Sequence, residues 1–245
     1  MSIFKTFKLA KKIQNDPLWN AECAKGNHAL ENRNPSRTDV INFLIQERDN
    51  PRYLEIGTRN PDNNFNHIKA IEKFSVDPGI EFSDNPVDFP MTSDEFFKLI
   101  DEDPSKIDDQ LFDIIFIDGL HRAQQAYRDI LNALRWIKPD GFVVVHDCNP
   151  PTEWHQRTDF NFKHTPAGIR WNGTTWKAFV KARQIKNIMS CCIDSDWGIG
   201  VLCVHKNIGK ATTAIDQFMD YDDFDRSRKA LLNLVTYDEF KENLK

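Results

Sequence analysis

The 245-residue chain contains few cysteines, no long apolar run and no excess of positive charge. Its five cysteines show no CxxC spacing, and their odd number, with Cys191 and Cys192 adjacent, favours buried free thiols in a reducing compartment. No run approaches the roughly 18 apolar residues that a transmembrane helix needs, and the first residues lack the apolar core of a signal peptide. We therefore expect a cytoplasmic protein without a transmembrane segment.

The charge balance argues against a nucleic-acid-binding surface, because the net charge is −5 and the pI is about 5.8. Positive charge is concentrated in the first 14 residues, which predict a basic amphipathic helix. Such a helix packs on its own domain, packs on a partner subunit or contacts an anionic membrane surface. Its apolar residues are Ile3, Phe4, Phe7 and Ile13, and its cations are Lys5, Lys8, Lys11 and Lys12.

Apolar runs that alternate with amphipathic stretches predict an α/β domain in the middle of the chain. A strand–turn–strand at the end of a parallel sheet requires an antiparallel last strand, so we expect a mixed sheet. Strands are expected at 52–56, 74–77, 114–117, 142–145, 187–193 and 199–205, with a brief one near 89–91. Helices are expected at about 39–48, 60–73, 93–100 and 123–137, from residue 173 onward, and in the tail 211–245.

The segment 148–173 has no clear period, and an ordered loop of this length is usually functional. Aromatic and cationic side chains in it suit a sugar ring or an anionic group, although tryptophans that only anchor a surface loop would give the same composition. These side chains are Trp154, His155, Arg157, His164, Arg170 and Trp171.

A carboxylate and a histidine follow each of two successive apolar strands. Asp118 and His121 follow residues 114–117, and His146 and Asp147 follow residues 142–145. Ligands of open parallel α/β sheets bind beyond the carboxyl ends of the strands. We therefore expect acid–base or metal-binding groups at that edge.

The spacing between Gly57 and Asp77 predicts a pocket for a nucleoside. The two residues are 20 positions apart, the separation at which an acid after the second strand meets ribose hydroxyls. A dinucleotide needs the second glycine of GxGxxG, which the loop after Gly57 lacks, and Asp62 would repel a phosphate. S-adenosylmethionine has a ribose and no phosphate, so the pattern favours it over NAD.

Seven segments occur in one order along the chain: LEIGTRNPDNNF, SVDP, TSDEFF, FDIIFIDGLHRAQQAYRDI, KPDGFVVVHDCNP, WNGTTWKA and SDWGIGVL. Together they resemble the class I S-adenosylmethionine-dependent methyltransferases over about residues 50–206. The IDG-x-H and HD-C-N-P signatures are similar to those of a small bacterial branch often associated with sugar, capsule or natural-product biosynthesis. The resemblance implies a Rossmann-like sheet of seven strands whose last strand is antiparallel.

The resemblance also implies cofactor-binding roles for six residues. Helix capping is an alternative role for Ser93 and Asp94, and the missing glycines leave the contacts of the loop 58–62 open. The implied roles are Glu55 and Gly57 near the methionine end, Asp77 on the ribose, Ser93 and Asp94 near the adenine, and Asp118 beside the methyl group.

A hydroxyl acceptor needs a general base or a metal ion that lowers its pKa. His121 is the predicted base, because an imidazole titrates near neutral pH and follows Asp118 closely. Asp118, His146 and Asp147 would orient it or bind substrate. The alternative is Mg²⁺ held by Asp118 and Asp147, although Cys148 stands where metal-dependent relatives have Asn or Asp.

These observations predict a methyltransferase domain at 51–206 between a helical extension at 1–50 and a helical tail at 207–245. The predicted reaction is O-methylation of a small polar acceptor such as a sugar, with N-methylation left open. A cofactor-binding scaffold without turnover and a nicotinamide-dependent oxidoreductase are the alternatives. The expected partner is a small molecule and not a nucleic acid, and a homo-oligomer is left open.

Overall fold

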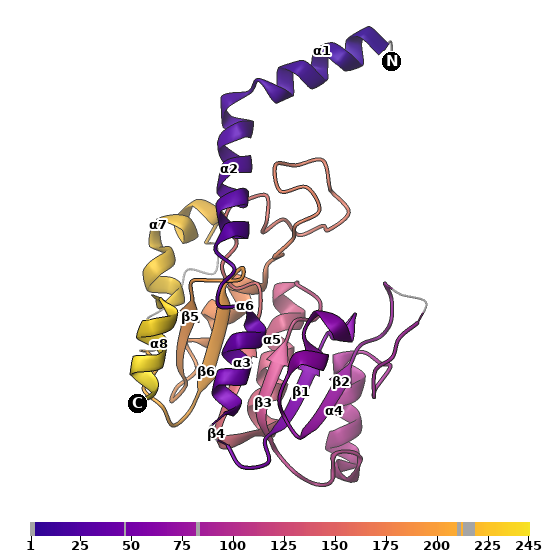
Figure 1. Ribbon diagram of the computed structural model, residues 1–245, viewed down its shortest axis with the longest axis vertical. Coiled ribbons are helices and arrows are strands. Elements are labelled where there is room, and N and C mark those ends of the chain that lie inside the picture. The colour runs from indigo at the N-terminus through magenta and orange to yellow at the C-terminus, as the bar shows by residue number, and fades with distance from the viewer. Residues whose placement is uncertain (1–2, 47, 82–83, 210–211, 213–218) are drawn as a thin grey trace.

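The computed structural model describes residues 3–46, 48–81, 84–209, 212 and 219–245. Its centre is a seven-stranded sheet with the order β2-β1-β3-β4-β6-β5-β7 (Figure 1). β1 to β4 run parallel, β6 is antiparallel to both β4 and β5, and β7 pairs parallel with β5. The predicted mixed sheet is confirmed, with its antiparallel strand supplied by the closing hairpin. The strands are β1 (Arg52–Ile56), β2 (Glu72–Val76), β3 (Phe112–Ile117), β4 (Ile137–Val145), β5 (Met189–Ile193), β6 (Ile199–Cys203) and β7 (Leu234–Val235).

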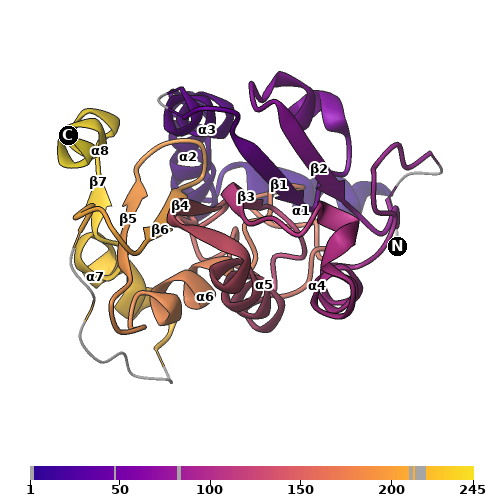
Figure 2. The same cartoon turned by 90° about the horizontal axis from the view of Figure 1, so that it is seen from below.

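Helices cover both faces of the sheet, which makes three layers (Figure 2). Successive strand residues point to opposite faces: in β1, Leu54 packs in the core on one face and Tyr53 in the core on the other. On the first face lie α4 (Ser93–Glu102), α5 (Ala123–Trp136), α6 (Thr175–Ala182) and α7 (Tyr221–Leu232), and on the second lie α3 (Arg37–Ile45) and α8 (Tyr237–Leu244).

The start of α3 is set by a capping box that positions the site. The Ser36 side chain accepts from the backbone N–H of Asp39, and the Asp39 carboxylate accepts from the backbone N–H of Ser36 at 2.9 Å. This arrangement satisfies two N–H groups that a helix start leaves free. Arg37 is therefore held in the first turn of α3. α4 begins at Ser93 as predicted, and its capping box is likewise complete, but the capping residue is Thr92 and not Ser93 or Asp94.

The predicted helix at 60–73 is wrong. The chain there forms two 3₁₀ turns, η1 (Pro61–Asn63) and η2 (Phe65–His67), before β2 begins at Glu72. Asparagine side chains compete with helical hydrogen bonds: Asn64 turns inward and donates to the Glu55 carboxylate at 2.7 Å. Ile71, an apolar residue of the same segment, is 69% exposed.

Two further boundaries differ from the prediction. The expected strand near 89–91 is a single bridge between Phe89 and Val76, so β7 in the tail completes the count of seven. β4 begins at Ile137, and the turn-like residues 138–141 lie within it, next to a register shift against β3. A Cβ at Gly141 would lie 2.8 Å from the carbonyl oxygen of Asp113, so glycine permits this close pairing. A short 3₁₀ helix, η3 (Pro104–Ile107), precedes β3.

Two helices before α3 extend away from the sheet, α1 (Ile3–Gln14) and α2 (Pro17–Glu31) (Figure 1). α2 contacts the segment 148–173: the Cys23 thiol donates to the Pro166 carbonyl, and Gly26 packs against the His155 ring. α1 contains no buried residue. Within the described ranges, every helix is too short or too polar to cross a membrane.

Candidate functional site

Four predicted residues form one cluster at the carboxyl ends of β3 and β4. Asp118 Oδ1 lies 3.3 Å from His121 Nε2 and 3.2 Å from His146 Nδ1. Asp147 Oδ2 lies 3.3 Å from His121 Nδ1 and 3.3 Å from His146 Nδ1. The structure thus brings together two carboxylates and two imidazoles at the edge of the sheet where the sequence predicts them.

Two residues that the sequence did not point to complete this cluster. Asp196, in the turn between β5 and β6, accepts from the backbone N–H of Arg37 at 2.9 Å and lies 3.7 Å from His146 Nε2. The Arg37 guanidinium lies 3.3 Å from Asp196 and 3.9 Å from Asp118. The only local signal was the break at Asn34-Pro35 before a capped helix, which does not indicate what Arg37 contacts.

The backbone at the cluster is strained in three places. Asp147, Asp196 and Trp197 adopt φ angles of 60°, 41° and 65°. A non-glycine residue in this left-handed region costs about 1–3 kcal/mol and persists where its surroundings hold it. This concentration at one edge of the sheet supports a functional role for the cluster.

The charges of the cluster hold its members in their ionised forms. Burial opposes ionisation of Asp118, but His146, His121 and Arg37 hold the pKa of its carboxyl well below the ordinary range. Burial likewise opposes protonation of His121, but Asp147 and Asp118 raise its pKa to about 9. The pKa of His146 is also raised by Asp118 and Asp147 despite burial. The two carboxylates therefore favour the protonated form of both imidazoles.

The end of the segment 148–173 fixes His121. His121 Nδ1 lies 2.9 Å from the carbonyl oxygen of Trp171, and the two rings stack with centroids 5.1 Å apart. Gly173 has φ +59°, and a Cβ there would lie 2.0 Å from the carbonyl oxygen of His121. Asn172 donates to Asp147 at 2.7 Å. This segment therefore positions both a histidine and a carboxylate of the cluster.

Other side chains of the same segment hold the loop itself. Arg157 donates through Nη1 and Nη2 to the carbonyl oxygens of Trp154, Arg170 and Gly168 at 2.7–3.0 Å, while its Nε is buried without a hydrogen-bond partner among the described residues. His155 is fully buried, and burial lowers its pKa to about 4. Arg157 thus holds the loop through its two Nη groups, and His155 contacts Thr152 through Nδ1 while its Nε2 is buried without a partner in the part of the chain that the structure describes.

The turn at Gly57 joins the tips of three strands. The Gly57 N–H donates to the carbonyl oxygen of Val76 in β2 at 2.8 Å, and the Asp118 N–H donates to that of Ile56 in β1 at 2.9 Å. Gly57 has φ +87°, and a Cβ there would lie 2.4 Å from the carbonyl oxygen of Asp118. Glycine is therefore required for the close approach of this turn to β3.

The other predicted cofactor residues have different surroundings. Asp77 lies at the tip of β2, where its carboxylate accepts from the backbone N–H groups of Arg59 and Gly79 at 2.8 and 2.7 Å. Ser93 and Asp94 contact α5: Gln125 donates to Ser93 at 3.0 Å, and Asp94 forms an ion pair with Arg128. Glu55 is 2% exposed and accepts from Tyr53 and Asn64, and burial raises its pKa to about 7.

Asp118, His121 and Asp147 could together hold a metal ion. One ligand atom from each lies within 4.8 Å of the others. Two carboxylate oxygens and an imidazole nitrogen suit a divalent cation. The predicted pair Asp118 and Asp147 thus gains His121 as a third candidate ligand.

Comparisons with known proteins give one family and several solved structures. A search of curated proteins finds no match. An O-methyltransferase from Bacillus cereus in complex with SAH is 15% identical, with a TM-score of 0.43 over 76% of this chain and 90% of that one. TomG from Streptomyces achromogenes, an O-methyltransferase involved in tomaymycin synthesis, was solved with SAM and is 13% identical, with a TM-score of 0.41 over 78% and 90% of the two chains.

One family model, that of a methyltransferase domain, matches residues 30–148 of this chain. The matched residues include α3, β1 to β4 and the cluster residues up to Asp147. The predicted Rossmann-like sheet is confirmed, and the family match supports the predicted enzyme class. Residues 30–148 of this chain are therefore similar to a methyltransferase domain.

Proposed function

We propose that the chain transfers the methyl group of S-adenosylmethionine to a hydroxyl group of a small polar acceptor, such as a sugar. The observation that carries this proposal is the cluster at the tips of β3 and β4, where His121 lies 3.3 Å from both Asp118 and Asp147. A methyl transferase must position its acceptor and raise the acceptor's nucleophilicity, since the cofactor supplies the electrophile. A rigidly held imidazole between carboxylates suits that task.

The strand tips fit an adenosine-bearing cation. Asp77 and Asp118 follow the two strands that flank β1, so they stand about 10 Å apart across the sheet. The Asp77 carboxylate suits ribose hydroxyls, and the ionised Asp118 suits a positive charge. S-adenosylmethionine supplies a methyl group on a positively charged sulfur. Glu55 would lie beneath the turn at Gly57, near the methionine end of the cofactor, and Ser93 and Asp94 would lie near its adenine end.

His121 is proposed as the general base. Because Asp118 and Asp147 favour its protonated form, His121 becomes a base once another positive charge neutralises those carboxylates. The Trp171 carbonyl and Asp147 hold Nδ1, which leaves Nε2, beside Asp118, to exchange a proton with the acceptor. His146, Arg37 and Asp196 would orient Asp118.

A divalent cation is the alternative means of activating the hydroxyl. Asp118, His121 and Asp147 would hold it, and it would lower the pKa of the hydroxyl. The two alternatives make opposite predictions for exhaustive chelation with EDTA. Activity that survives chelation supports His121 as the base, whereas loss of activity that Mg²⁺ restores supports the metal.

The proposal also covers the acceptor site, the cellular location and the division of the chain. The segment 148–173 is proposed to cover the acceptor, with the partly exposed Trp154 available to a sugar ring. A cytoplasmic location, and the division at residues 50 and 206, are further parts of the proposal. α3 contributes Arg37 to the cluster, so the segment 1–50 would take part in the function of the domain.

The test combines cofactor binding with turnover. Calorimetry with S-adenosylmethionine is expected to show binding, and Asp77→Asn is expected to weaken it. A methyl-transfer assay against a panel of nucleotide sugars is expected to show turnover that His121→Ala reduces. Binding without transfer to any acceptor would favour a non-catalytic scaffold. Binding of NAD(H) in place of S-adenosylmethionine would favour an oxidoreductase.

A further inference from the structure

The first helix exposes an apolar face that the rest of the described chain does not cover. Ile3, Phe4 and Phe7 are 85%, 81% and 71% exposed, and Leu9 is half exposed. At 100° per residue, Ile3 and Phe7 fall within one half of the helix, together with Ala10. Clustered large apolar side chains on a surface indicate an interaction site.

The opposite side of the same helix is strongly basic. Residues 3–14 contain four lysines and no acidic residue, so α1 has a net charge of +4. The net charge of the whole chain is −5, so the rest of the chain has a net charge of −9. On a helical projection, three of the lysines fall opposite Ile3 and Phe7. These three are Lys5, Lys8 and Lys12, whereas Lys11 falls between Phe7 and Phe4. A lysine-rich polar face opposite an apolar face is typical of helices that lie in the headgroup layer of an anionic membrane.

The position of α1 suits a surface outside the molecule. α2 has 15 residues and is therefore about 22 Å long, and it carries α1 away from the sheet (Figure 1). The electrostatic screening length at physiological salt is about 8 Å. An anionic surface in contact with α1 would therefore experience little repulsion from the acidic body around the sheet.

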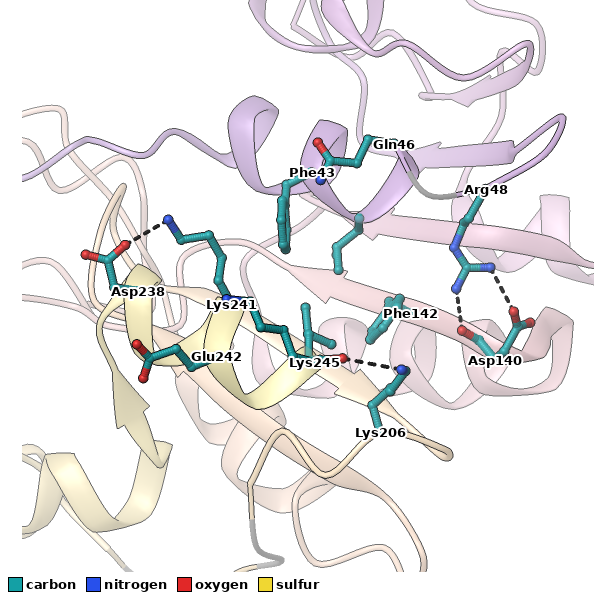
Figure 3. A pocket seen from close by; sticks show the side chains of 12 residues that line it. Phe43, Gln46, Arg48, Asp140, Phe142, Lys206, Asp238, Lys241, Glu242 and Lys245 are labelled. Atoms are coloured by element: carbon teal, nitrogen blue, oxygen red, sulfur yellow. Dashed lines mark hydrogen bonds and ion pairs between the residues drawn. The ribbon is translucent and has the colours of Figure 1, made fainter.

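A groove on a second copy of the chain fits the helix less well. A groove of about 750 Å³ between α3 and α8 has apolar walls formed by Phe43 and Phe142 (Figure 3). Arg48 and the lysines on its rim at least balance its acids, and Asp140 and Asp238 already pair with cations. It therefore offers no surplus negative charge to a helix of +4. The cations are Arg48, Lys206, Lys241 and Lys245, and the acids are Asp140, Asp238 and Glu242.

We propose that α1 docks the protein on anionic lipid bilayers, with its apolar face in the headgroup layer and its lysines on the lipid phosphates and carboxylates. The proposal does not depend on the methyl-transfer chemistry. The helix lies parallel to the membrane and does not span it. Binding combines burial of Phe4 and Phe7 with attraction of the lysines, so it requires negative lipid charge and weakens with salt.

The test is flotation of the full chain with phosphatidylcholine vesicles, with and without about 30 mol % phosphatidylserine. Only the anionic vesicles are expected to bind the protein, and raising the salt from about 0.1 M to about 0.5 M is expected to release it. The variant Lys8→Gln/Lys11→Gln is expected to lower the partition coefficient about 25-fold, at roughly fivefold per lysine. Phe4→Ser/Phe7→Ser is expected to lower it about a hundredfold, at roughly tenfold per ring.

Matched controls replace residues of the same kinds outside α1. Lys98→Gln/Lys186→Gln removes two exposed lysines, and Leu18→Ser removes an apolar side chain of α2 that is 78% exposed. Both controls are expected to bind vesicles like the unaltered protein. Equal binding to neutral vesicles, or no binding to anionic ones, overturns the proposal. A dimer in analytical ultracentrifugation that Phe4→Ser/Phe7→Ser dissociates, without vesicle binding, assigns the face to a second copy and also overturns it.

Discussion

Replacing Glu55 by glutamine is expected to remove part of the pH dependence of the protein's stability. Glu55 lies in β1 with 2% of its surface exposed, and its carboxyl group accepts from the Tyr53 hydroxyl at 2.5 Å and from Asn64 at 2.7 Å. Burial outweighs these hydrogen bonds and raises its pKa from 4.5 to about 7. Glutamine keeps the shape of the side chain and an oxygen that accepts both bonds, but it cannot ionise.

The sign and size of the effect follow from the raised pKa. The folded state binds the proton of Glu55 more tightly than the unfolded state, so this stabilisation is complete below pH 4.5 and is lost as pH rises through about 7. Between pH 5 and pH 8 the loss amounts to about 2.5 kcal/mol. The advantage of Glu55→Gln over the unaltered protein should therefore grow by about 2.5 kcal/mol over that interval.

The measurement is urea unfolding of both proteins at several pH values between 5 and 8, with linear extrapolation to water. Other groups with raised pKa values, such as Asp129 at about 6, are present in both proteins and cancel in the difference. A difference that stays constant across this interval would refute the argument, because it would mean that Glu55 ionises in the folded protein as easily as in the unfolded chain. A changed slope with urea would indicate altered compactness instead.

Three further predictions concern the cluster and its supports. His121→Ala is expected to lower turnover by about 10²–10⁴-fold while donor affinity stays within about twofold, as measured by steady-state kinetics and calorimetry. Gly173→Ala is expected to cost about 2–3 kcal/mol in urea unfolding, because φ is +59° and a Cβ would overlap the His121 carbonyl, and to lower turnover as well. Thr236→Ala removes the capping box of α8 and is expected to cost about 1 kcal/mol without changing turnover.

Each of these predictions has an outcome that would contradict it. Unchanged turnover in His121→Ala would remove this residue as base and as metal ligand. Gly168 has a similar φ of +57° but open space around a Cβ, so Gly168→Ala is the control for Gly173→Ala. Equal losses of turnover in these two variants would show that contact with His121 is not the cause. Lower turnover in Thr236→Ala would show that α8 affects the cluster.

Local patterns predicted the parts of the fold that depend on local rules. The helix at 123–137 was clear because its apolar residues fall on one stripe, and α5 spans Ala123–Trp136. The hairpin of β5 and β6 was clear because two apolar runs flank a short polar turn. The helix at 60–73 was wrong because the inward hydrogen bond of Asn64 depends on Glu55 and Tyr53, which lie in a separate strand.

The composition of the cluster was only partly predictable. Asp118, His121, His146 and Asp147 could be found because the carboxyl ends of parallel strands share one edge of a sheet. Arg37 and Asp196 could not, since they are 159 positions apart and meet only after α3 packs on the sheet and the last hairpin closes. The sequence pattern around Arg37 or around Asp196 does not indicate that the two residues come into contact.

The pairing of Arg37 with Asp196 has a consequence for biosynthesis. Domains form from the amino end while the ribosome is still adding residues, and most of the parallel strands are complete once residue 145 has emerged. Asp196 emerges about 50 residues later, so until then Arg37 and His146 lack one of their carboxylate neighbours. A nascent chain at that stage would have a nearly complete scaffold and an incomplete cluster. Under the proposed function, incomplete translation products would therefore lack the full set of charges around His146.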